Sequence, residues 1–158
     1  MHHAKYVLFC VLALPALGGA QGRDGRHGWI YGLAGPGFFS GDGSAVFNAA
    51  GGGEVLLING LALGGELGFA APDGIGLASA GVSYHFGGRD RGRRMVPFIT
   101  GGGSLAFRSS ASAGGGNIGG GIQYWVRDRM TLRFEFRDFI FSSDSPHLLM
   151  FRVGVAFR

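Results

Sequence analysis

Large hydrophobic residues recur at every second position through most of this chain. In the final segment, FRVGVAFR, phenylalanine and valine alternate with arginine, glycine and alanine. No segment carries apolar residues at helical spacing over three turns, and period-2 alternation is typical of β-strands. The pattern predicts eight strands, over residues 28–38, 45–57, 61–70, 76–86, 96–107, 116–126, 130–141 and 148–158.

The two faces of each predicted strand differ in a way that suits lipid better than water. In RFEFRDF (133–139), one face carries phenylalanines and the other carries Arg133, Glu135 and Arg137. A soluble sandwich would leave the glycine-rich or charged faces in water, although glycine weakens strands. A membrane barrel turns the large residues to lipid and keeps the small ones inside. We therefore predict an all-β fold, an eight-stranded antiparallel up-and-down transmembrane β-barrel.

The alternation in RFEFRDF predicts a conflict at its end. Continued without change, it would place Asp138 on the lipid side and turn Phe139 and Phe141 inward. A carboxylate that faces lipid is costly. We expect the pattern to shift there, through a bulge or at the membrane rim.

The first twenty residues differ in composition from the rest. Lys5 precedes an apolar run over 6–17, and Gly18-Gly19-Ala20 follows it. This order is typical of a secretory signal peptide, and the run is shorter than the roughly 20 residues of a membrane-spanning helix. We expect cleavage after Ala20, so that 1–20 is a signal peptide and 21–158 is one barrel domain. The sole cysteine, Cys10, lies within this run.

Glycine is unusually frequent, at 33 of 158 residues, but aromatic residues reach 13%. Disordered glycine-rich chains are normally poor in aromatic residues, so we expect an ordered domain. The formal net charge of +4 is scattered along the chain and does not favour nucleic-acid binding.

Two short connections test the assignment of faces. In LLINGLAL (56–63), a strict two-residue turn at the Asn-Gly pair would put Glu54 on the apolar face. A three-residue loop pairs Leu57 with Leu61 and puts Glu54 on the same face as Glu66, which we expect because a carboxylate in lipid is costly.

The same reasoning applies to VRDRM (126–130). A three-residue loop pairs the first and last residues of this segment. Gln123 is then predicted opposite Arg133, and Gly121 opposite Glu135, which leaves space for the charged side chains.

Four glycine- and aromatic-rich segments carry a resemblance to a known family: GLALGGELGF, VPFITGGG, GGGIQYW and RFEFRD. With the signal peptide and the eight alternating segments, they resemble the small outer-membrane β-barrels of the OmpA and OmpX type. The resemblance implies a bacterial outer-membrane location, contact with lipid and lipopolysaccharide, and insertion by the Bam machinery. That machinery reads the last strand and its terminal aromatic residue, here Phe157. We expect a monomer.

Several motifs favour ordinary structural roles. GGGNIG (114–119) fits G-x-G-x-x-G, but a strand follows where a dinucleotide site needs a helix. His85 lies on one face with Ser79 and Ser83, which suggests acyl transfer, but no third group is placed to orient the imidazole. We expect a polar residue satisfied by its lumen neighbours.

Two polar segments lie in predicted connections. SSDSPH (142–147) lacks the His-x-Ser-Asn segment of PagL-type lipid A deacylases and is typical of a turn. The basic stretch over 89–94 suits a solvated turn beside the membrane, and contact with anionic periplasmic partners is the alternative. No spacing suggests a metal site, and we predict no catalytic, cofactor-binding or metal-binding residue.

The remaining charged residues form one inward-facing set that must be paired in a lumen of low dielectric. Its members are Glu54, Glu66, Arg133, Glu135, Arg137 and Arg152. They predict a structural barrel filled by its own side chains, with no catalysis and no cofactor. The alternatives are a narrow pore or a barrel that binds a small molecule or lipid, a lipid A-modifying enzyme, and a soluble lipocalin-like barrel.

Overall fold

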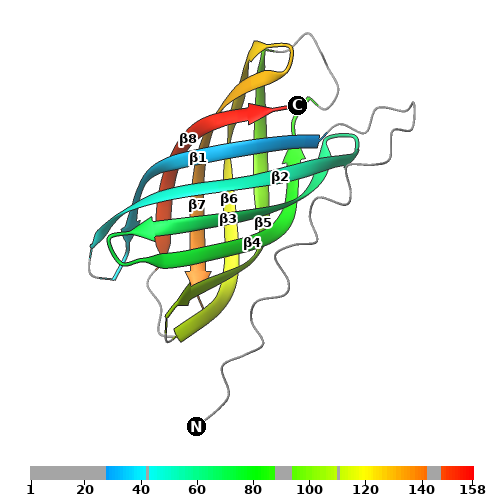
Figure 1. Ribbon diagram of the computed structural model, residues 1–158. Coiled ribbons are helices and arrows are strands. Elements are labelled where there is room, and N and C mark those ends of the chain that lie inside the picture. Colours follow the sequence, from blue (N-terminus) through cyan, green and yellow to red (C-terminus); the bar gives the residue numbers. More distant parts are fainter. Residues whose placement is uncertain (1–27, 42, 88–93, 110, 142–146) are drawn as a thin grey trace.

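The computed structural model describes residues 28–41, 43–87, 94–109, 111–141 and 147–158, which form one closed barrel (Figure 1). All eight predicted strands are present, and each pairs antiparallel with its neighbours. Their bounds are β1 Gly28–Phe39, β2 Ala45–Ile58, β3 Leu61–Ala71, β4 Ile75–His85, β5 Met95–Arg108, β6 Ala111–Arg127, β7 Met130–Phe141 and β8 Leu148–Phe157. The predicted fold class is confirmed. The largest difference is at β6, which begins five residues before the predicted start at 116.

The barrel closes because β8 pairs with β1 along most of both strands. The strands are staggered: a row of paired residues followed once around the barrel from Val96 returns to β5 at Ala106, ten residues further along. A stagger of this size tilts the strands against the barrel axis. Charged residues from distant strands therefore reach a common level.

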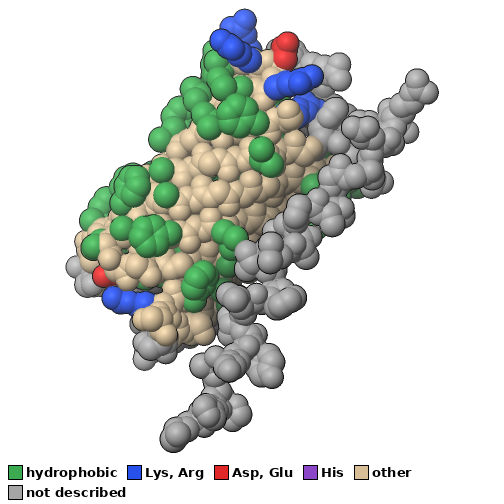
Figure 2. All heavy atoms as spheres, in the orientation of Figure 1, with side chains coloured by type: hydrophobic (Ala, Val, Ile, Leu, Met, Phe, Trp, Pro, Cys, Tyr) green, Lys and Arg blue, Asp and Glu red, His purple; other side chains and the backbone are tan. Residues whose placement is uncertain are grey.

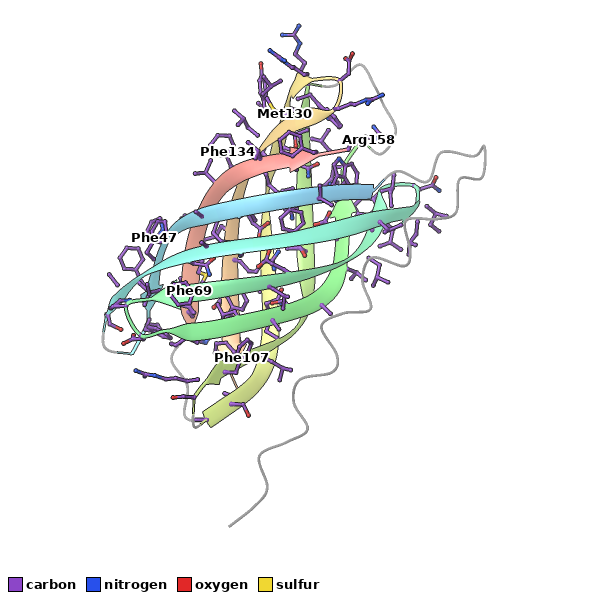
Figure 3. The ribbon with its side chains drawn as sticks, in the orientation of Figure 1. Phe47, Phe69, Phe107, Met130, Phe134 and Arg158 are labelled. Atoms are coloured by element: carbon purple, nitrogen blue, oxygen red, sulfur yellow. The ribbon has the colours of Figure 1, made fainter. Side chains whose placement is uncertain are left out.

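Burial alternates along each strand as predicted. Phe47, Phe69, Phe107 and Phe134 point away from the barrel (Figure 3) and are 49–57% exposed. Arg133, next to Phe134, is fully buried inside. The molecule thus carries its large hydrophobic side chains on the outside, where they form much of the visible surface (Figure 2).

The tight turn between β2 and β3 corrects one prediction. Ile58, not Leu57, lies opposite Leu61. Asn59 and Gly60 both have positive φ, 43° and 91°, as in the two-residue hairpin turn whose twist matches that of the strands. A register shift between Leu56 and Ile58 then restores the pairing and returns Glu54 to the interior, where it is 3% exposed.

The turn between β6 and β7 has the same construction. Arg127, not Val126, lies opposite Met130, and the register shifts between Trp125 and Arg127. Beyond this bulge the predicted pairs are confirmed: Gln123 lies opposite Arg133, and Gly121 opposite Glu135. In both hairpins a bulge shifts the register by one residue, so that a two-residue turn is compatible with charged side chains that face the lumen.

The expected shift of the pattern at Asp138 is wrong. Pairing of β7 runs through Asp138 on both sides with no bulge there, and Phe139 is fully buried. Asp138 faces outward, and its Oδ2 lies 2.9 Å from Nδ1 of His147. His147, the residue before β8, therefore provides a polar partner for Asp138, and the alternation of faces continues without the shift that we expected.

Several sequence-based predictions fall on other parts of the chain. The predicted signal peptide, residues 88–93 of the basic connection and residues 142–146 of SSDSPH lie outside the described residues. Within the described ranges there is no helix that is both long enough and apolar enough to cross a membrane.

Candidate functional site

The six charged residues singled out from the sequence all lie inside the barrel. Glu54 comes from β2, Glu66 from β3, Arg152 from β8, and the other three from β7. Each is between 0% and 7% exposed. Because strand alternation aims every second side chain at the lumen, these four strands deliver three carboxylates and three guanidinium groups to one region.

Glu135 is the centre of this charged layer, because it contacts all three arginines. Its Oε2 accepts a hydrogen bond of 2.9 Å from Nε of Arg133. Its Oε1 lies 2.5 Å from Nη2 of Arg152 and 2.7 Å from Nε of Arg137. One buried carboxylate thus joins the guanidinium groups of two neighbouring strands.

Glu54 receives three donors on the other side of Arg133. Nη2 of Arg133 donates to its Oε1 at 2.9 Å, and Ser83 Oγ donates to the same oxygen at 3.3 Å. Nε2 of His85 lies 2.9 Å from its Oε2. Glu54 therefore connects β7 to β4 across the lumen.

Glu66 completes the layer through a bidentate pair with Arg152. The two oxygen–nitrogen distances are 2.5 and 3.1 Å. Arg137 lies at 3.6 Å from Glu66, which makes this the longest ion pair of the network. Paired geometry of this kind offsets the cost of taking charges out of water.

Aromatic rings enclose the buried guanidinium group of Arg133. Its central carbon lies 4.5 Å from the ring centroid of Tyr31 and 4.1 Å from that of Phe98. His85 stacks between Trp29 and Phe98, at 4.9 and 5.5 Å. These stacks fix the planes of the imidazole and the guanidinium group, and the contacts over Arg133 add cation–π attraction.

Two apolar clusters lie on either side of the charged layer along the barrel. One is Trp29, Tyr31, Leu33, Leu56, Ala62 and Ala156. The other, toward the end where β7 finishes, is Val46, Ala70, Leu77, Phe139, Leu148 and Met150. All are at most 7% exposed. Side chains therefore fill the interior above and below the ion pairs.

The wall opposite the arginines is lined by small polar residues. Ser79 and Ser104 hydroxyls lie 3.0 Å apart, and Asn117 donates to Ser104 at 2.7 Å. A small polar cavity of about 20 Å³ lies between this wall and the ion pairs, and both Glu66 and Arg137 contribute to its lining. Gly64 and Gly65 of β3 and Gly81 of β4 also line this space.

His85 and its neighbouring serines do not form a nucleophile–base pair. The imidazole contacts Glu54, Ser83 also contacts Thr100 at 3.1 Å, and Ser79 contacts Ser104.

The described residues contain no cluster of potential metal ligands. GGGNIG lies within β6, so it opens no helix.

Sequence reasoning left His85 and the two rings over Arg133 out of the charged network. Each lies at an inward position of its strand, so alternation identified their face but not their neighbours.

Phe157, proposed as the assembly signal, is the last residue of β8 and is 45% exposed on the outer surface.

No protein-family profile and no curated protein matches the chain in sequence. Solved structures do match its fold. The N-terminal β-barrel domain of Pseudomonas aeruginosa OprF has a TM-score of 0.61 at 16% identity, over 83% of this chain and 100% of that one. Neisserial surface protein A gives 0.62 at 17%, over 85% and 99%. OprG from Pseudomonas aeruginosa gives 0.57 at 8%, over 84% and 97%. The fold is that of the small eight-stranded outer-membrane barrels of the OmpA and OmpX type.

Proposed function

We propose that this chain is an integral outer-membrane protein whose barrel is filled by its own side chains, with a structural role, no catalysis and no open pore. Outer-membrane lipid and lipopolysaccharide would surround it, and the Bam machinery would insert it by reading the strand that ends at Phe157. The fold itself is shown by the structure, whereas the outer-membrane location and the structural role are proposed.

The observation that carries the proposal is the inverted distribution of side chains. Among the residues that the structure describes, twenty-six large hydrophobic residues are exposed, from Ile30 to Phe157, while the six charged residues of the network are buried. In water such a surface would aggregate, because soluble monomers rarely expose contiguous apolar patches beyond a few hundred Å². In a bilayer the same surface faces acyl chains.

The packing of the lumen supports a structural role. The ion pairs connect β2, β3, β7 and β8, so they cross-link strands that are far apart in the sequence. An eight-stranded barrel is just wide enough for its side chains to fill. Apolar clusters lie on both sides of the charged layer, which supports a lumen closed by side chains.

Membrane fractionation together with a heat-modifiability gel tests the location and the fold. A folded membrane barrel is recovered with the outer membrane and migrates differently before and after boiling. A mature chain that stays in the soluble fraction and migrates identically in both lanes would contradict the proposal. The soluble lipocalin-like alternative predicts that second result.

The polar cavity beside Arg137 favours one second candidate, a narrow pore or a small-molecule binder. Conduction would require the Arg137–Glu66 contact to open and both apolar clusters to separate. Single-channel recording in planar bilayers distinguishes the two candidates. Our proposal predicts no steps above the baseline, and Arg137→Ala should not create them, because the apolar clusters remain.

A further inference from the structure

The two ends of the barrel differ in charge. The end that carries Gly28, the two tight turns and the C-terminal residue has four described arginines, Arg94, Arg127, Arg129 and Arg158, against one aspartate, Asp128. We call this the basic end. Met130 and Arg158 mark it in Figure 3, and arginine side chains gather there in Figure 2.

The opposite end is balanced. Its described connections carry Asp73 and Arg108, and Asp138 is paired with His147. The excess of arginine is therefore a property of one rim and not of the whole surface. A general need for solubility would not place it at one end.

The basic end adjoins the outer apolar surface directly. Arg94 is followed by Met95, which is 54% exposed, and Arg127 is preceded by Val126, which is 46% exposed. The turn of Asp128 and Arg129 has only two residues between the paired Arg127 and Met130. Guanidinium groups on so short a turn stay close to the level at which the apolar surface ends.

We propose that the basic end is a docking surface for the anionic phospholipid head groups of the leaflet that meets it. This inference rests on the proposed membrane location and adds the lipid class and the end that binds it. Guanidinium groups pair with phosphate through two parallel hydrogen bonds, and each arginine at an anionic membrane surface strengthens the attraction by about fivefold. An acidic protein partner would need a projecting loop or groove, and the two described hairpin turns of this end provide none.

Both tryptophans of the chain lie at this end and can report on it. Trp29 begins β1 and Trp125 is near the end of β6. The guanidinium carbon of Arg158 lies 5.9 and 5.8 Å from their ring centroids. Trp29 lies inside the barrel and is 6% exposed, whereas Trp125 is partly exposed. Tryptophan fluorescence therefore reports on lipid at the basic end mainly through Trp125, even when a quencher is present in both leaflets.

The test refolds the full chain into phosphatidylcholine vesicles that contain a fixed fraction of phosphatidylglycerol. A small amount of either lipid carries a nitroxide on the acyl chain beside the head group. Quenching by labelled phosphatidylglycerol should exceed quenching by labelled phosphatidylcholine by about fivefold or more, because a single arginine contributes about that factor. The ratio should fall toward one in high salt, because exposed charges are screened.

Three variants make the result specific. Combining Arg94→Gln, Arg127→Gln and Arg129→Gln should lower the ratio clearly below the wild-type value, with Arg158 left in place. Asp128→Asn, which removes the acidic group of this rim, should raise it. Arg108→Gln at the opposite end is the matched control and should leave it unchanged.

The inference is overturned by a wild-type ratio of one, or by an equal response to the two sets of arginine replacements. Refolding into phosphatidylcholine alone, followed by gel migration, separates this outcome from failure of the proposed function. A barrel that folds there but shows no lipid preference contradicts only the docking surface. A chain that folds in neither vesicle overturns both.

Discussion

Replacing Glu135 by glutamine should strongly destabilise the barrel. Glu135 contacts Arg133, Arg137 and Arg152, and all four residues are at most 4% exposed. Glutamine keeps the size of the side chain but removes its charge, so three buried guanidinium groups would face two carboxylates. Leaving one buried charge without its counterion costs about 3–5 kcal/mol.

A compensating replacement separates charge balance from packing. Arg137 pairs only with Glu135 and, at 3.6 Å, with Glu66. In the double variant Glu135→Gln, Arg137→Gln, each remaining charge keeps its short contact: Arg133 with Glu54 and Arg152 with Glu66. We therefore expect the double variant to recover most of the lost stability, to within about 1–2 kcal/mol of the original barrel.

The measurement is the free energy of unfolding in lipid vesicles, from urea titrations followed by tryptophan fluorescence. Ser104→Ala, which removes a lumen hydroxyl on the opposite wall, is the control for a neutral polar change. An unfolding free energy unaltered by Glu135→Gln would refute the reasoning. So would a double variant that is less stable than either single variant, because the losses would then be independent of charge balance.

Three further predictions concern single sites. Gly154→Ala should lower the unfolding free energy by at least ~2 kcal/mol, because its Cβ would lie against the backbone oxygen of Gly32, whereas Gly32→Ala has open space and should be nearly neutral in the same titration. Arg133→Lys should cost about 1–3 kcal/mol, since lysine cannot bridge two carboxylates while stacked between two rings. Asp138→Asn and His147→Gln should show a coupling of about 0.5–1 kcal/mol in a double-mutant cycle, and additive losses would contradict the pairing.

The faces of the strands were predictable because the alternation of side chains is a local property. A period of two requires no knowledge of the partner strand, so RFEFRDF alone placed its phenylalanines outside and its charges inside. Eight repeats of this pattern, together with faces that suit lipid, predicted a closed barrel. The register in both tight hairpins was correct beyond their bulges for the same reason.

The errors arose where two local rules competed. The Asn-Gly pair favoured a two-residue turn, whereas the face of Glu54 favoured a three-residue loop. The structure satisfies both by adding a bulge at Leu57. At Asp138 the cost of an outward carboxylate suggested a shift of the pattern, but His147 supplies a partner that strand periodicity does not predict.

The sequence by itself determined which side chains enter the lumen, and the tertiary structure decided which of them meet. Glu54 and Arg133 are 79 residues apart and contact each other only because the barrel closes with a particular stagger. The same closure places His85 between two rings and gives Glu135 its three arginines. Alternation depends on the geometry of one strand, whereas pairing across the lumen depends on the tilt and register of all eight.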